Sequence, residues 1–125
     1  MDHKKIILIL IIILGVSYFP LKHYLLKRTI TRMAVEILHN WQNNNLTGNY
    51  VYWKDPMQSP PIYGLNSYEI IKTTFEKKEI SSVQVYMRLD FPADNLLPSG
   101  KIWIMEFYKF PRLGWLVVDF NQENP

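Results

Sequence analysis

The chain has 125 residues, no Cys and a formal net charge of +3, and this length fits one domain rather than two. The absence of Cys excludes disulfides, thiolate catalysis and Cys-ligated zinc or iron–sulfur centres. Hydrophobic residues make up 48% of the chain and aromatic residues 14%, a composition too apolar for a disordered protein.

The charge is distributed unevenly along the chain. Residues 1–32 contain six Lys or Arg and one acid, a balance of +5, whereas residues 33–125 contain eight Lys or Arg and ten acids, a balance of −2. The basic pI of the whole chain, about 9.1, therefore comes from the excess of Lys and Arg at the N-terminal end. The slightly acidic remainder disfavours nucleic-acid binding.

An apolar run lies close to the N-terminus. Ile6–Leu14 consists of Ile and Leu only, and a less strict continuation leads to Pro20, where we expect the run to end. Three interpretations compete: an uncleaved signal-anchor, a cleaved signal peptide and a buried apolar helix. The run has no polar face, which disfavours the buried helix, and its small-residue cleavage pattern is weak. We predict a transmembrane signal-anchor or signal peptide over residues 1–20, and a folded domain over residues 21–125.

Basic residues flank this run on both sides. A short tail with two Lys predicts a cytoplasmic N-terminus, whereas the four basic residues after the run favour the opposite orientation. We predict a single-pass membrane protein whose domain is extracytoplasmic. Two interpretations of the basic residues stay open, a solvated helix face and contact with anionic lipid head groups. The membrane-flanking basic residues are Lys4, Lys5, Lys22, Lys27, Arg28 and Arg32.

A long helix is predicted over Leu21–Asn45. Apolar residues recur there at steps of three and four, which is the period of a helix with one buried face. Three consecutive Asn residues and then Gly48 are expected to end it. The stripe comprises Leu26, Ile30, Met33, Ile37 and Trp41, and Ala34 and Leu38 widen it.

The middle of the chain is predicted as an extended or turn-rich stretch at Tyr50–Trp53 and a Pro-rich loop from Asp55 to Gly64. The sequence Asn66-Ser67-Tyr68-Glu69 resembles a capping box. It predicts a second helix, extending to about Lys78.

Three strands are predicted in the C-terminal part, over Ser82–Phe91, Lys101–Phe110 and Trp115–Phe120. The first alternates apolar and polar residues, as a half-buried strand does. The second is apolar on both faces, which indicates a strand covered on both sides. The predicted fold class is therefore α+β, with a long helix packed on a curled antiparallel sheet.

Three short segments resemble the NTF2-like (cystatin-like α+β cone) superfamily over about residues 30–120. They are Ile37–Trp41 at the end of the helix, Tyr52-Trp53-Lys54-Asp55-Pro56, and Gly114–Phe120 in the last strand. The resemblance implies a long helix inside a bent sheet. The superfamily includes ketosteroid isomerase, cyclases, epoxide hydrolases, non-enzymatic proteins and membrane-anchored subunits of secretion systems.

The resemblance also implies that the open end of the cone can hold a small apolar ligand. Two alternatives are open: the aromatic residues line such a pocket, or they fill the cone as part of the core. The second is favoured, because a small domain needs its large side chains to form a core. Asp119 in the last strand is expected to find a partner in Arg88 or to form an exposed strand face. The candidate pocket residues are Tyr52, Trp53, Asp55, Tyr63, Tyr68, Arg88, Trp103, Trp115 and Asp119.

The function expected from these observations is binding without catalysis. No catalytic residue, metal site or cofactor is predicted, and the three His residues lack a metal-ligand spacing. The helix can cover only one of the two apolar faces of the sheet. Because the other face also needs a partner, we expect a homodimer or docking onto a membrane protein complex. The alternative is a small apolar-ligand binding protein, or an isomerase- or hydrolase-like enzyme that uses a cone-shaped pocket.

Overall fold

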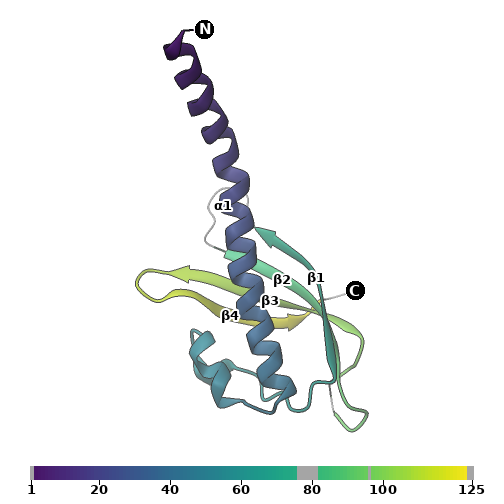
Figure 1. Cartoon of the computed structure of the whole chain (residues 1–125). Helices are drawn as coiled ribbons and strands as arrows, with labels where there is room; N and C mark the ends of the chain where they lie inside the picture. The colour runs from purple at the N-terminus through teal and green to yellow at the C-terminus, as the bar shows by residue number, and fades with distance from the viewer. Residues whose placement is uncertain (1, 76–81, 96, 124–125) are drawn as a thin grey trace.

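The computed structural model describes residues 2–75, 82–95 and 97–123, with the backbone alone for residues 15–20. Within these residues one long helix lies across an antiparallel sheet of four strands, in the order β1-β2-β3-β4 (Figure 1). The α+β class and the packing of a helix on a curled antiparallel sheet are thus confirmed. The elements are α1 (His3–Gln42), η1 (Thr47–Tyr52), η2 (Pro56–Gln58), β1 (Ser67–Phe75), β2 (Ser82–Asp90), β3 (Lys101–Phe110) and β4 (Gly114–Gln122).

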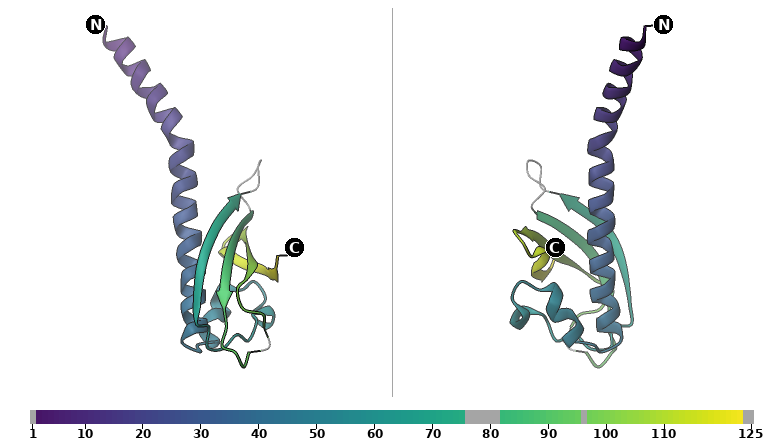
Figure 2. Two further views of the ribbon diagram at one scale, coloured as in Figure 1. Left: turned by 90° about the vertical axis from the view of Figure 1, so that its right-hand side faces the viewer. Right: turned by 60° about the vertical axis from the view of Figure 1, so that its left-hand side comes forward.

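Helix α1 joins the apolar N-terminal run to the predicted long helix without a break. The expectation that Pro20 ends the run is wrong, because α1 continues through it. A proline inside a helix removes one backbone hydrogen bond and favours a bend. Figure 2 shows α1 bending between the part that stands away from the sheet and the part that lies on it. The boundary expected at residue 20 therefore falls inside one helix.

The end of α1 matches the prediction closely. The helix stops at Gln42, and Asn44 adopts a left-handed φ of 59°, a conformation that Asn tolerates better than most residues. The side-chain oxygen of Asn44 accepts a hydrogen bond of 2.6 Å from the backbone N–H of Gly64. This bond ties the helix end to the loop that leads into the sheet.

The core lies between α1 and the inner face of the sheet. The predicted helical stripe supplies the helix side, since Ile30, Ile37 and Trp41 are fully buried and Leu26 and Met33 pack against them. On the sheet side, alternate residues of β2 are buried and their neighbours are more exposed, as expected for a strand with one covered face. The buried apolar residues of the sheet are Val83, Val85, Met87, Leu89, Met105, Phe107 and Val117.

The segment after residue 66 is a strand, so the predicted second helix is wrong. In β1, Tyr68 pairs with Leu89 and Phe75 pairs with Val83 of β2. These long-range partners override the local capping-box pattern, because strand stability depends on packing against a neighbour. The part of the predicted helix beyond residue 75 lies outside the described residues. The sheet therefore has four strands where three were predicted.

The three predicted strands are confirmed as β2, β3 and β4, with end shifts of at most two residues. Of the two alternatives for Tyr50–Trp53, extended or turn-rich, the second fits most of the stretch, because η1 continues to Tyr52. Trp53 is extended and forms a bridge to Val117 of β4. Figure 2 shows α1 against one face of the sheet. On the opposite face of β3, Ile102 and Ile104 are half-buried and Tyr108 is exposed.

Candidate functional site

The tryptophans of the candidate pocket belong to an aromatic cluster on the inner side of the sheet. Trp103 stacks on Phe120 with ring centroids 5.0 Å apart. Trp41 lies 5.2 Å from Phe120 and 6.1 Å from Trp53. Trp115, at the start of β4, is half-buried against the same core. In this region the aromatic rings contact one another and pack against the core.

Two indole N–H groups in this cluster have no hydrogen-bond partner among the described residues, those of Trp41 and Trp103. Burial of an unpaired donor costs free energy, so such groups are unusual in a core. Trp41 was predicted in the core stripe of the helix, and Phe120 was predicted at the end of the last strand. The structure makes Phe120 the ring that joins Trp41 to Trp103.

The three candidate tyrosines are positioned by different contacts. Tyr52, at the end of η1, donates a hydrogen bond to the carboxylate of Glu36 on α1. This hydrogen bond is the main reason that the pKa of the Tyr52 hydroxyl lies above its usual value. Burial of the hydroxyl and the negative charge of Glu36 raise the pKa further. The hydroxyl of Tyr68 lies 3.0 Å from Nε2 of His39. Tyr63 is exposed and lies in the loop before β1.

Nothing in the sequence separates Glu36 and His39 from ordinary exposed helix residues. Each becomes a hydrogen-bond partner only because η1 and β1 fold back onto the C-terminal half of α1. Glu36 and His39 therefore could not be predicted as partners of the two tyrosines.

The charged candidates lie apart from one another. Asp55 caps η2, where its side chain accepts a hydrogen bond of 3.1 Å from the backbone N–H of Met57. Arg88 forms an ion pair of 3.0 Å with Glu69 on the neighbouring strand. Of the two alternatives left open for Asp119, pairing with Arg88 is therefore wrong, and the exposed strand face is the one that the structure has. The carboxylate of Asp119 instead accepts a hydrogen bond of 2.7 Å from the side chain of Asn121.

A β-bulge explains why Asp119 leaves the inner side of the sheet. The register shifts between β3 and β4, so that Glu106 pairs with Asp119 while Phe107 pairs with Val117. An extra residue in one strand reverses which face the following side chains take. Val117 is consequently buried and Asp119 is exposed.

Cavities on the described surface include three that bring together few of the candidate residues. One of about 260 Å³ is lined by Tyr63 with Asn44, Gly64, Pro92, Asp94 and Asn95. One of about 80 Å³ lies between the ends of β1 and β2. A third, of about 440 Å³, lies along α1 and is lined by Tyr24, Lys27, Arg28, Thr31 and Arg32. Of the candidate pocket residues, Tyr63 alone lines any of these three.

The N-terminal part of α1 stands away from the sheet (Figure 1). All nine side chains of Ile6–Leu14 are exposed, with exposed fractions between 39% and 70%. In the described part of the chain, no helix meets the combined length and hydropathy needed to cross a bilayer. The flanking basic residues Lys4, Lys5 and Lys22 are exposed as well.

Comparison of the chain with protein-family models, with curated proteins and with solved structures gave no match in any of the three searches.

Proposed function

We propose that this protein is a membrane-anchored binding domain without catalysis, held at the bilayer by the N-terminal part of α1. The observation that carries this proposal is the exposed Ile6–Leu14 segment, in which nine consecutive Ile and Leu residues project from the domain. Water is an unfavourable environment for such a surface. Burial of one Ile or Leu side chain is worth about 1.5–3 kcal/mol.

The bilayer is the partner that fits this surface best, because the segment is apolar around its whole circumference. A protein groove covers one face of a helix, whereas acyl chains surround all of them. Nine helical residues extend about 13 Å along the axis. With its helical continuation, the run over residues 6–21 extends about 24 Å, which is most of a hydrocarbon core about 30 Å thick. The Lys residues on both sides can keep their charges at the surface while their stems contact lipid.

The direct test is flotation of the full chain with neutral phosphatidylcholine vesicles on a density gradient. The proposal predicts that the chain rises with the vesicles and stays with them in high salt, because apolar contacts are not screened. A chain that stays at the bottom of the gradient while remaining folded and monodisperse contradicts the proposal.

We place the domain on the extracytoplasmic side and expect it to bind a second copy of itself or another membrane protein. The proposed surface is the face of the sheet turned away from α1, which includes Ile102, Ile104 and Leu116. An antiparallel sheet with one solvated face normally carries polar residues there. Tethering two copies in one membrane raises their effective concentration and favours such a weak contact.

The NTF2-like (cystatin-like) relationship is part of the same proposal. It rests on the three segments described above and on the packing of one long helix across a curled four-stranded sheet. Chemical crosslinking of the full chain in vesicles tests the self-association, with Ile104→Glu as the disrupting variant. We expect the wild-type chain to yield a crosslinked dimer and the variant to lose it. Equal yields for both contradict this surface.

A further inference from the structure

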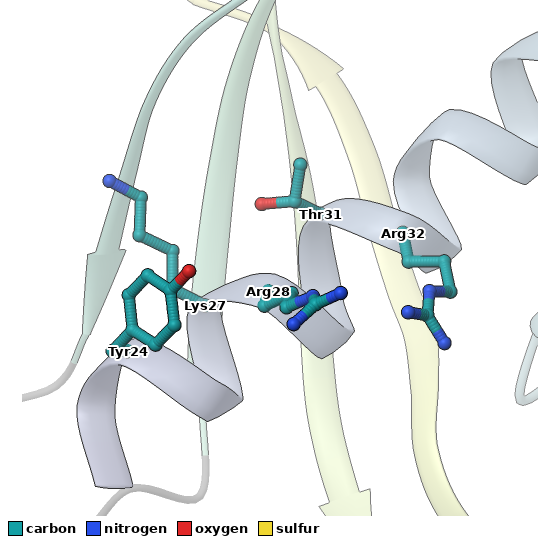
Figure 3. Close-up of a pocket in the computed structure, with 5 residues that line it drawn as sticks. All are labelled: Tyr24, Lys27, Arg28, Thr31 and Arg32. Atoms are coloured by element: carbon teal, nitrogen blue, oxygen red, sulfur yellow. The ribbon is translucent and has the colours of Figure 1, made fainter. Parts of the chain in front are cut away.

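A basic face lies on α1 between the apolar segment and the part of the helix that packs on the sheet. It consists of Lys27, Arg28 and Arg32, with Tyr24 and Thr31 between them, and these five residues line the concavity of about 440 Å³. Their spacing of three and four residues places them along one side of the helix. Figure 3 shows the five side chains along this short stretch of α1.

Among the described residues, no acid forms an ion pair with the positive charges of this face. Lys27, Arg28 and Arg32 are exposed, and in the described part of the chain none of them forms an ion pair. Asp2 and Glu36 are the acids within residues 1–42. Asp2 is 25 residues away from Lys27, and the carboxylate of Glu36 accepts the hydrogen bond from Tyr52.

The position of the face along the helix suits a lipid surface. Lys22 follows Leu21, two residues after Pro20 at the end of the apolar run. Lys27 lies five residues further on, or about 7.5 Å along the axis. The polar layer on each side of a bilayer is about 5–8 Å thick. Helical side chains also lean toward the N-terminus of their helix, so Lys27, Arg28 and Arg32 lean toward the membrane.

We propose that this basic face binds the phosphate groups of anionic phospholipids at the membrane surface. The proposal rests on the membrane anchorage described above and adds a preference for the lipid. Arg binds phosphate through two parallel N–H groups and Lys through a point charge, and the Tyr24 and Thr31 hydroxyls add donors beside them. The apolar segment holds the chain in any bilayer, and the basic face selects an anionic one.

The test compares binding of the full chain to vesicles of phosphatidylcholine alone and to vesicles that also contain phosphatidylglycerol. Each basic residue near an anionic surface contributes about fivefold in affinity. We therefore expect the wild-type chain to prefer anionic vesicles by tenfold to a hundredfold, on the order of the product of these contributions. This preference weakens as salt rises.

The variant K27Q/R28Q/R32Q is expected to lose this preference and to keep its affinity for neutral vesicles. The matched control is K54Q/K101Q/K109Q, which removes three exposed charges from the sheet and its loops. Equal losses in the two triple variants, or no preference in the wild-type chain, overturn the proposal. Loss of neutral-vesicle binding would instead contradict the membrane anchorage.

A final arm separates lipid head groups from free phosphate. Excess inorganic phosphate is added to the anionic vesicles and compared with sodium chloride at the same ionic strength. We expect both salts to reduce binding equally, because the face recognises a charged surface. Selective displacement by phosphate would identify a site for a small soluble anion and overturn the assignment to phospholipid.

Discussion

The hydroxyl of Tyr52 donates a hydrogen bond to the carboxylate of Glu36, 16 residues earlier in the chain. This bond fixes the end of η1 against the solvent side of α1. It also occupies the acid that lies one helical turn after Arg32. Among the residues that the structure describes, no ion pair joins Glu36 to Arg32.

Tyr52→Phe is expected to lower the free energy of unfolding by about 1 kcal/mol, the value of one hydrogen bond. The substitution keeps the ring and removes the donor. Urea denaturation followed by tryptophan fluorescence measures the change. Tyr63→Phe is the matched control, because that hydroxyl is exposed and its loss is expected to leave stability unchanged. A destabilisation of equal size in both variants would show that the Glu36 bond is not the cause.

The same bond predicts a dependence of stability on alkaline pH. The pKa of Tyr52 is raised in the folded chain above its usual value of 10.0, so the folded state holds this proton more tightly than the unfolded state. The contribution is fully present below pH 10 and is lost as pH rises through the raised folded pKa. Urea midpoints measured across this range are expected to fall more steeply for the wild-type chain than for Tyr52→Phe. Parallel curves would refute the assignment.

The buried Asn49 side chain holds η1 against the end of α1. It accepts a hydrogen bond of 2.8 Å from Asn40 and donates one of 3.2 Å to the backbone carbonyl of Ile37. Asn49→Ala removes both of these hydrogen bonds and is expected to cost about 1–3 kcal/mol. Thermal or urea unfolding measures this loss. Asn43→Ala, which changes an exposed side chain at the helix end, is expected to cost less; the reverse order would contradict the role of Asn49.

The proposed orientation in the membrane is testable by thiol labelling, because the chain has no Cys. Met57 is 91% exposed, so Met57→Cys presents one thiol on the folded domain without disturbing packing. In intact cells this thiol is expected to react with a membrane-impermeant maleimide. Asp2→Cys, on the other side of the apolar run, is expected to react only after lysis. The opposite pattern would place the domain on the cytoplasmic side.

Elements with a strong hydrophobic period were predictable from the sequence. The stripe from Leu26 to Trp41 predicted the packed half of α1, and alternation predicted β2. The strand β1 was not predictable locally, because Tyr68, Ile71 and Phe75 also fit a helical spacing. Pairing with β2 makes this segment a strand. The pairing residues of β2 lie too far along the chain to contribute to a local sequence pattern.

The candidate site was less predictable than the fold. Simple alternation places Val117 and Asp119 on one face, but the bulge between them turns Asp119 outward. A bulge is hard to predict from the sequence, because it is defined by two residues of one strand lying opposite one residue of the neighbouring strand. The partners of Tyr52 and Tyr68 were missed for a similar reason, since both lie on α1, distant in sequence. The basic face was predictable from the sequence, because its residues lie close together on one helix.

The most direct test of membrane anchorage is alkaline carbonate extraction of membranes that carry the full chain. The wild-type chain is expected to stay in the membrane pellet. The variant I9K/I12K places two charges in the exposed apolar segment and is expected to move to the soluble fraction with its fold intact. The control M57K/L113K makes the same changes at two exposed positions of the domain and is expected to stay in the pellet. Release of the wild-type chain, or retention of I9K/I12K, would contradict anchorage by this segment.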